Sequence, residues 1–256
     1  MSDRTGWWNI YRWRNGAVEP VTEIEAEFAR PQWIFGSSTY AFQSDSRIIC
    51  SYVQGGNWKL ASVDTELREL NPIPTPYSDM ARGDLRVASE TAVIIAGSPV
   101  EALSVVRLDL AAGDTHVLRT SGDVSLGRAY LSTPEAIEYP TENGLTAHAF
   151  YYPPSNGDYE PIPGENPPLL VKSHGGPTSA TSVALDLGIQ YWTSRGFAVL
   201  DVNYGGSTAY GRAYRERLRG QWGIVDVDDC VNGALYLVRQ GLADGKIGRA
   251  SCRERV

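Results

Sequence analysis

The stretch "LLVKSHGGPTSAT", Leu169 to Thr181, decides the interpretation of the C-terminal half of the chain. Its first residues form a short apolar run, which is typical of a buried strand. His174, Gly175 and Gly176 follow this run directly. Because glycine has no side chain, backbone N–H groups in such a loop can turn outward and donate to a developing oxyanion. The same residues also fit a tight turn without a catalytic role, and the stretch alone leaves both interpretations open.

Strands and helices alternate around this stretch. The runs "TAHAFYYPP" before it and "FAVLDVNY" after it read as strands. Between them, Leu185, Ile189 and Trp192 fall at near-helical spacing, with Gly196 as the expected C-cap. The run "DVDDCVNGALYLVRQG" predicts another helix, opened by aspartates that suit a helix N-terminus. This order predicts a mainly parallel sheet covered on both faces. An HGG loop after a buried strand of such a sheet is typical of the first half of an α/β-hydrolase domain.

The N-terminal half has a different pattern, with short strand-like runs and no convincing long helix. The runs are "WNIYRWR", "QWIFG", "TYAFQ", "RIICSYV", "KLASVD", "LRVAS", "TAVIIAG" and "LSVVRLD". Turns rich in Gly, Asn, Asp and Pro separate them. This spacing predicts an antiparallel all-β unit.

A weak internal repeat runs through these strands. "LASVD" ends at Asp64 and "VVRLD" ends at Asp109, so the two aspartates lie 109 − 64 = 45 residues apart. "NIYRWRNG", residues 9–16, resembles the same segment. Blades of a β-propeller recur at about 40–45 residues, so the half reads as two C-terminal blades and the end of a third. Since a propeller needs at least about four blades, we expect the N-terminal blades to be missing. A β-sandwich with accidental spacing is the alternative.

Two side chains near the HGG loop could be taken for catalytic groups. His174 precedes every plausible nucleophile, whereas in the α/β-hydrolase order of Ser, acid and His the catalytic histidine comes last. We therefore expect His174 to shape the loop. Ser207 in "YGGSTAYG" stands close to a GxSxG elbow, but it follows the very next strand, one strand-helix unit too early. A turn near the mouth of the site is the expected role of Ser207.

The last strand-helix unit is expected to begin near Lys246, where the chain reads "KIGRASCRERV". Ser251 stands near the place of an elbow serine, but arginines crowd a run that should be apolar. The sequence is therefore predicted to be unable to build the elbow, and residues 247–256 are predicted to be a non-native tail.

Several stretches resemble the prolyl oligopeptidase family of serine peptidases, in particular its bacterial dipeptidyl aminopeptidase and acylaminoacyl-peptidase-like branch. They are "SDRTGWWNIYRW", "EFARPQW", "LLVKSHGGPTSAT" and "QYWTSRGFAVLDVNYGGSTAYGRAYRERLRGQWGIVDVDDC". The resemblance implies C-terminal blades of a β-propeller over residues 1–127, followed by the first half of an α/β-hydrolase domain over residues 128–246. It further implies that the chain is a fragment and that the propeller filters small peptides.

The resemblance also assigns roles to residues. Gly176, and with it Gly175, would be backbone oxyanion donors, while His174 and Tyr204 would border the substrate. The GGSAGG-like elbow expected near Gly248 is absent, as are the acid and histidine that would follow. The chain is therefore expected to be inactive, although its parent would cleave short peptides through an acyl-enzyme. An esterase or acyltransferase on the same fold, and a propeller-based binding module with a vestigial hydrolase part, are the alternatives.

Composition and residue counts limit the partners, the cellular compartment and the cofactors that we expect for this protein. The net charge of −7 argues against nucleic acid and anionic membranes as partners. Three scattered cysteines, no signal peptide and no long apolar run favour a reducing compartment, the cytoplasm. His116, expected in a turn, and His148, expected in a strand, are too scattered for a metal site, and no cofactor is indicated. Glu23, Glu25 and Glu27 could bind a substrate's amino terminus, but a solvated acidic stretch is favoured. Oligomeric state is not indicated.

Overall fold

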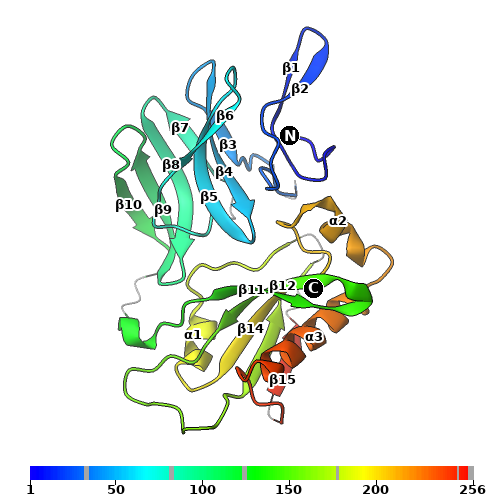
Figure 1. Cartoon of the computed structure of the whole chain (residues 1–256). Helices are drawn as coiled ribbons and strands as arrows, with labels where there is room; N and C mark the ends of the chain where they lie inside the picture. The colour runs from blue at the N-terminus through cyan, green and yellow to red at the C-terminus, as the bar shows by residue number, and fades with distance from the viewer. Residues whose placement is uncertain (32–34, 81–83, 123–125, 177–178, 247, 253–256) are drawn as a thin grey trace. The chain divides into compact units, whose positions relative to one another are not determined.

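The computed structural model describes residues 1–31, 35–80, 84–122, 126–176, 179–246 and the backbone of 248–252. The chain divides into two compact units, which are described separately (Figure 1). The first unit comprises Met1–Asp123 and Ala209–Ala213, and the second comprises Val124–Thr208 and Tyr214–Val256. Most of the predicted strand "QWIFG" lies outside the described residues.

The first unit consists of antiparallel sheets, as the short turn-bounded runs predicted. Strands β1 (Tyr11–Arg14) and β2 (Ala17–Pro20) form a hairpin. One four-stranded sheet contains β3 (Tyr40–Phe42), β4 (Arg47–Gln54), β5 (Asn57–Asp64) and β6 (Glu69–Ile73), in that order. The other contains β7 (Arg86–Ala88), β8 (Thr91–Ser98), β9 (Glu101–Asp109) and β10 (Thr115–Thr120). His116 lies on β10 opposite Arg107 rather than in a turn, because this exposed edge strand is too polar to show an apolar alternation.

The repeat seen in the sequence has a physical counterpart in these two sheets. Asp64 and Asp109 each end the third strand of a four-stranded sheet. The carboxylate of Asp64 accepts from two N–H groups of the following turn at 2.8 Å each, and Asp109 does so at 2.9 Å each. These backbone bonds lower the pKa of Asp109. The two sheets are therefore built from equivalent segments.

The core of the first unit explains why β4 reads as a continuous apolar run. Ile49 packs with Leu60 and Ile94 between the two four-stranded sheets, and Ile48 and Cys50 pack on the opposite face of β4. Both faces of this strand are thus covered. Burial raises the pKa of the Cys50 thiol to about 12, so Cys50 is a protonated core residue.

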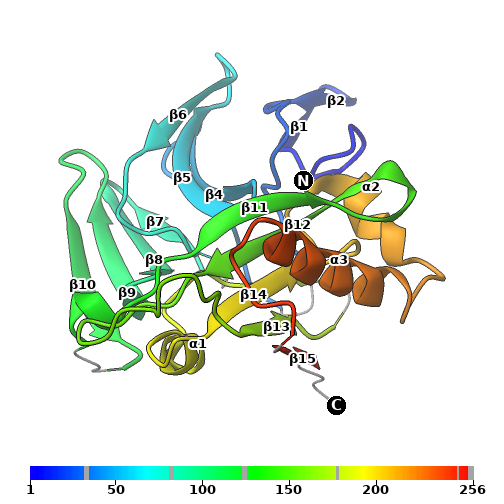
Figure 2. The same cartoon turned by 60° about the horizontal axis from the view of Figure 1, so that its bottom comes forward.

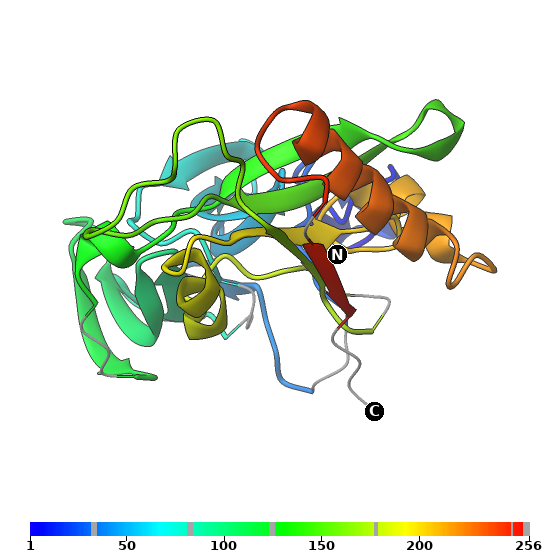
Figure 3. The same ribbon diagram turned by 90° about the horizontal axis from the view of Figure 1, so that it is seen from below.

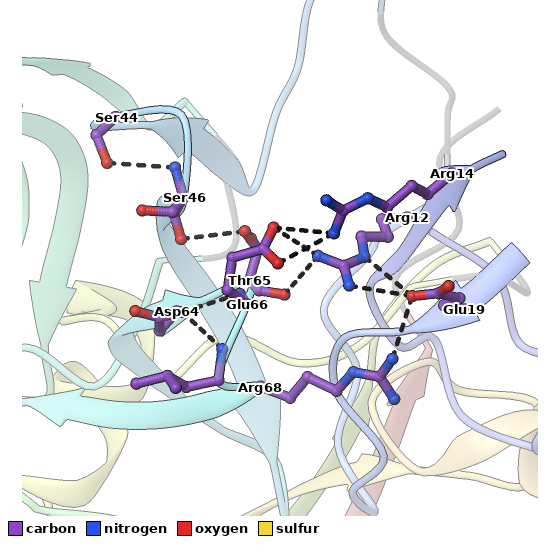
Figure 4. A network of polar contacts seen from close by, with 10 residues as sticks. Arg12, Arg14, Glu19, Ser44, Ser46, Asp64, Thr65, Glu66 and Arg68 are labelled. Carbon is purple, nitrogen blue, oxygen red and sulfur yellow. Dashed lines mark hydrogen bonds and ion pairs between the residues drawn. The ribbon is translucent and has the colours of Figure 1, made fainter.

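An ion-pair network joins the β1–β2 hairpin to the turn after β5 (Figure 4). The Arg12 guanidinium lies 3.0 Å from Glu19 and 2.8 Å from Glu66, and it also donates to the carbonyl oxygen of Thr65 at 3.0 Å. Arg14 pairs with Glu66, and Arg68 pairs with Glu19, each at 3.1 Å. Because an isolated two-stranded hairpin is marginally stable, these contacts help to fix it.

The second unit contains one five-stranded sheet with helices on both faces. Its strands are β11 (Glu135–Pro140), β12 (Thr146–Tyr152), β13 (Leu169–Ser173), β14 (Ala198–Asn203) and β15 (Gly248–Cys252), in the order β11-β12-β14-β13-β15. The helices are α1 (Leu187–Thr193), α2 (Gly211–Arg215) and α3 (Val225–Arg239), and residues 211–213 of α2 belong to the first unit. Single 3-10 turns are η1 (Arg128–Tyr130), η2 (Glu142–Gly144) and η3 (Glu216–Leu218).

The sheet is mixed, so the prediction of a mainly parallel sheet was only partly correct. β14, β13 and β15 are parallel, whereas β11 pairs antiparallel with β12 and β12 pairs antiparallel with β14. The short connection across η2 forces β11 and β12 into an antiparallel hairpin. Figure 3 shows β15, coloured dark red, alongside β13. A strand was expected to begin near Lys246, and residues 248–252 form one despite the arginines, because strand pairing is made by the backbone.

Side chains alternate between the two faces of this sheet. Leu169, Val171 and Leu200 pack toward Leu237 of α3, whereas Leu170 and Val199 pack toward Ile189 of α1. Figure 2 shows the two helices on opposite sides of β14. Every residue of β14 is buried, which explains its unbroken apolar run. Among the described residues, no helix has the length and hydropathy needed to cross a membrane.

Candidate active site

The residues singled out in the sequence meet at one edge of the second unit's sheet. β13 and β14 are adjacent and parallel, with Ser173 opposite Val202. Their carboxyl ends therefore open at the same edge, where His174 continues β13 and Tyr204 continues β14. Loops at the carboxyl ends of parallel strands are the usual place for a ligand site in α/β sheets.

His174 is held by side chains from the loop after β14. Its Nε2 lies 2.7 Å from Oγ of Ser207. Its ring stacks on Tyr204 with 4.5 Å between ring centroids and an interplanar angle of 21°. These contacts tie the start of the glycine loop to the segment after β14, and a loop-shaping role for His174 stays a prediction.

Burial lowers the pKa of His174 to about 4, and the backbones of Gly175 and Gly176 oppose this shift only in part. The imidazole is therefore neutral at neutral pH. A base with so low a pKa removes a serine proton poorly, because general bases work best with a pKa near the operating pH.

The tyrosine hydroxyl reaches the backbone of the glycine loop. Tyr204 donates to the carbonyl oxygen of Gly176 at 3.1 Å, and the carbonyl oxygen of His174 lies 3.4 Å away. Tyr204 is itself 6% exposed, so its position favours support of the loop over a wall of an open pocket.

Gly176 has a backbone conformation that favours glycine. Its φ is +71°, and a Cβ there would meet no atom within 4 Å, so the requirement is conformational rather than steric. Within the described part of the chain, no hydrogen bond engages the N–H of Gly175 or of Gly176. Gly176 is exposed, and Gly175 is partly buried.

Ser207 does not have the accessibility of a nucleophile. Its exposed fraction is 0%, and its Oγ is engaged by His174. A GxSxG nucleophile is displayed at the tip of a sharp turn, whereas Ser207 lies underneath the HGG loop. The expected role in a turn near the site agrees with this position.

One buried carboxylate behind the site was not among the candidate residues of the sequence motifs. Asp229 of α3 accepts from the N–H of Gly205 at 2.6 Å and from the hydroxyl of Thr141 at 2.5 Å. Burial raises its pKa, and Gly205, Thr141 and Arg217 oppose that shift. The signal was available in the helix, because Asp229, Gly233 and Leu237 recur every four residues and share its buried face.

The acidic stretch considered for an amino terminus lies in the first unit. Glu27 is buried, and its carboxylate accepts from the N–H groups of Gly211 at 3.0 Å and Trp8 at 3.3 Å. Glu23 and Glu25 are exposed. Glu27 thus holds backbone segments of its own unit, and the solvated interpretation fits the other two.

Comparison with protein-family models indicates the class of protein that this chain resembles. Residues 183–248 match the model of the prolyl oligopeptidase family. This match includes α1, β14 and the loop of Tyr204 and Ser207.

Individual proteins that are similar to the chain include peptidases from several organisms. The chain is similar to the acylamino-acid-releasing enzyme of Sus scrofa, with 31% identity over 176 residues, covering 68% of this chain and 21% of that enzyme. Dipeptidyl aminopeptidase BIII of Pseudoxanthomonas mexicana is 35% identical over 75 residues, covering 29% of this chain and 11% of that protein. The solved structure of a Mycobacterium tuberculosis puromycin-hydrolyzing peptidase matches with a TM-score of 0.93 and 41% identity, covering 98% of this chain and 39% of that chain.

These matches confirm the resemblance to the prolyl oligopeptidase family that the sequence indicated. The chain spans less than half the length of each of these three proteins.

Proposed function

We propose that this chain is part of a serine peptidase that hydrolyses short peptides, with Gly176 and Gly175 as backbone donors to its oxyanion hole. The observation that carries the proposal is the exposed glycine loop, whose N–H groups are open while the carbonyl oxygen of Gly176 is held by Tyr204. Peptidase names among the relatives support the reaction class, and the puromycin-hydrolyzing neighbour extends the substrate class to aminoacyl amides.

The architecture fits this proposal. We assign the repeated four-stranded sheets to C-terminal blades of a β-propeller within residues 1–127, and residues 128–246 to the first part of an α/β-hydrolase domain. Residues 247–256 are assigned to a non-native tail. Among the described residues, Cys50 and Cys230 carry thiols and form no disulfide, which supports a reducing compartment such as the cytoplasm.

The chemistry follows from the open donors. A serine Oγ attacks the carbonyl carbon of the scissile amide as a histidine takes its proton, and the carbonyl oxygen becomes an oxyanion. The N–H of Gly176 donates to that oxygen, and neutral His174 borders the substrate with Tyr204 behind it. The C–N bond then breaks as the amine receives the proton. We place the catalytic serine, aspartate and histidine outside residues 1–246, so the chain by itself is inactive.

The test compares two glycines in the product of the complete gene. Gly176 and Gly164 are both exposed, have φ of +71° and +83°, and have space for a Cβ. Alanine strains the backbone at either position by about 1 kcal/mol. Gly176→Ala should lower kcat for a dipeptide p-nitroanilide and for puromycin at least about tenfold, because it displaces an oxyanion donor. Gly164→Ala should leave kcat unchanged, and equal kcat values for the two variants would contradict the proposal.

A further inference from the structure

A charged cluster lies under the glycine loop, on the face of the sheet that carries α1. The Lys172 ammonium lies 3.2 Å from Asp186 and 3.1 Å from Asp201. Lys172 of β13 and Asp201 of β14 are paired in register, so their side chains share one face. The mechanism proposed above uses none of these three groups.

Burial makes this cluster costly. The side chain of Asp201 is 4% exposed, and within the described part of the chain its Oδ1 has no hydrogen-bond partner. Burial raises the pKa of Asp201 to about 6 even though Lys172 opposes the shift. Apolar residues of similar size would often be as stable as a buried ion pair, so stability alone does not explain a lysine between two aspartates.

The position of the cluster suggests what it does. Lys172 is two residues before His174, where the glycine loop begins. Asp186 stands where that loop ends, and its carboxylate caps α1 by accepting from the N–H groups of Gly188 at 2.8 Å and Ile189 at 3.4 Å. The ammonium thus links the beginning of the loop, the end of the loop and the neighbouring strand.

Other contacts hold the middle of the same loop on β14 and the segment after it. The N–H of Thr181 donates to Oδ1 of Asn203 at 2.9 Å, and the N–H of Thr208 donates to the carbonyl oxygen of Ser179 at 2.8 Å. Asn203 follows Asp201 on the same face of β14. The charged cluster is therefore the next layer beneath the contacts that place His174 and its glycines.

We propose that Lys172 is a positioning residue of the glycine loop: by bridging Asp186 and Asp201, it fixes the base on which His174 and the backbone donors of Gly175 and Gly176 are set. The inference rests on the function proposed above for this loop. The charged groups at the bridge are Lys172, Asp186 and Asp201, and each contacts at least one other.

The test reads the environment of His174 in the 256-residue chain, by following its ring signals in NMR spectra as a function of pH. The double variant Lys172→Met with Asp201→Asn removes the bridge and leaves no uncompensated buried lysine or Asp201 charge. If the bridge sets the loop, the His174 ring becomes hydrated and its pKa rises by at least about 1 toward the ordinary 6.5. An unchanged His174 pKa in a folded double variant overturns the proposal.

Two single variants separate positioning from a general loss of structure. Asp201→Asn keeps the Lys172 to Asp186 contact and an amide oxygen that can accept from the Lys172 ammonium, so the bridge persists and the His174 pKa should stay low. Lys172→Arg keeps a cation able to reach both carboxylates and should do the same. A rise in the His174 pKa in both single variants would also overturn the proposal, because it would not depend on the bridge. The readout needs no catalytic turnover, so it remains decisive if the peptidase proposal fails.

Discussion

The protonation of Asp201 is strongly changed by the fold. Its carboxyl is buried beside Lys172, and burial raises its pKa from 3.8 to about 6. The folded chain therefore binds this proton more tightly than the unfolded chain does. The resulting stabilisation is complete below the unfolded pKa and is lost as the pH rises through about 6.

This shift gives a prediction for Asp201→Asn. Relative to the variant, the wild-type chain should lose unfolding free energy as the pH rises from about 4 to about 7, because only the wild type has this titrating carboxyl. Urea unfolding of both chains across that range measures the difference. A difference that does not vary with pH would show that Asp201 titrates normally.

Two positions near the site require glycine for different physical reasons. Gly176 has open space around it and needs only its positive φ. Gly206 has φ of +124°, and a Cβ there would lie 2.6 Å from Cβ of Leu218, so packing also forbids a side chain. A sequence pattern marks both as loop glycines, but only the packed structure distinguishes an open donor from a close contact.

At the scale of elements, the ion-pair network predicts how firmly the β1–β2 hairpin is held. Arg12 contacts Glu19, Glu66 and the carbonyl oxygen of Thr65, whereas Arg14 contacts Glu66 with a more exposed side chain. Arg12→Leu should speed hydrogen exchange of the hairpin amides about fivefold, corresponding to about 1 kcal/mol of charge-assisted bonding. Arg14→Leu is the control and should change exchange less than about twofold, since exposed ion pairs contribute little. Equal exchange in the two variants would contradict this account of the network.

Elements with a strong local pattern could be predicted from the sequence. The run "LLVKS" predicted β13, residues 169–173, because a polar loop bounds a short apolar run on each side. The turn aspartates Asp64 and Asp109 revealed the repeat because each plays the same local role. The order of strands and helices placed the start of a strand near Lys246, where β15 begins. Its pairing with β13 could not be predicted, since it depends on backbone contacts between distant segments rather than on an apolar pattern.

The site was predictable to a similar degree. The motif identified His174 and the glycines, and the order of strands placed Tyr204 and Ser207 near them. The hydrogen bond from Gly205 to Asp229 joins residues 24 positions apart, and the ion pair of Lys172 with Asp201 joins residues 29 positions apart. No sequence motif links either pair. Such contacts arise from sheet register and helix packing, which a single sequence does not specify.

At the scale of the whole molecule, the chain consists of two units with separate cores and matches less than half of each relative compared above. One segment departs from the chain order, because Ala209–Ala213 belongs to the first unit although the second unit precedes and follows it. There the N–H of Arg212 donates to the carbonyl oxygen of Gly6 at 2.7 Å, and its guanidinium pairs with Asp3 at 2.8 Å. The segment directly after the site loop is thus part of the β-sheet unit.

The central claim is that the loop of His174, Gly175 and Gly176 serves a serine nucleophile that lies outside residues 1–246. The most direct measurement treats the product of the complete gene, and separately the 256-residue chain, with a fluorophosphonate and locates the modified residue by mass spectrometry. The account predicts modification of a serine beyond residue 246 in the complete product, none in the 256-residue chain, and none at Ser207 in either. Modification of Ser207, or an unreactive complete product, would contradict it.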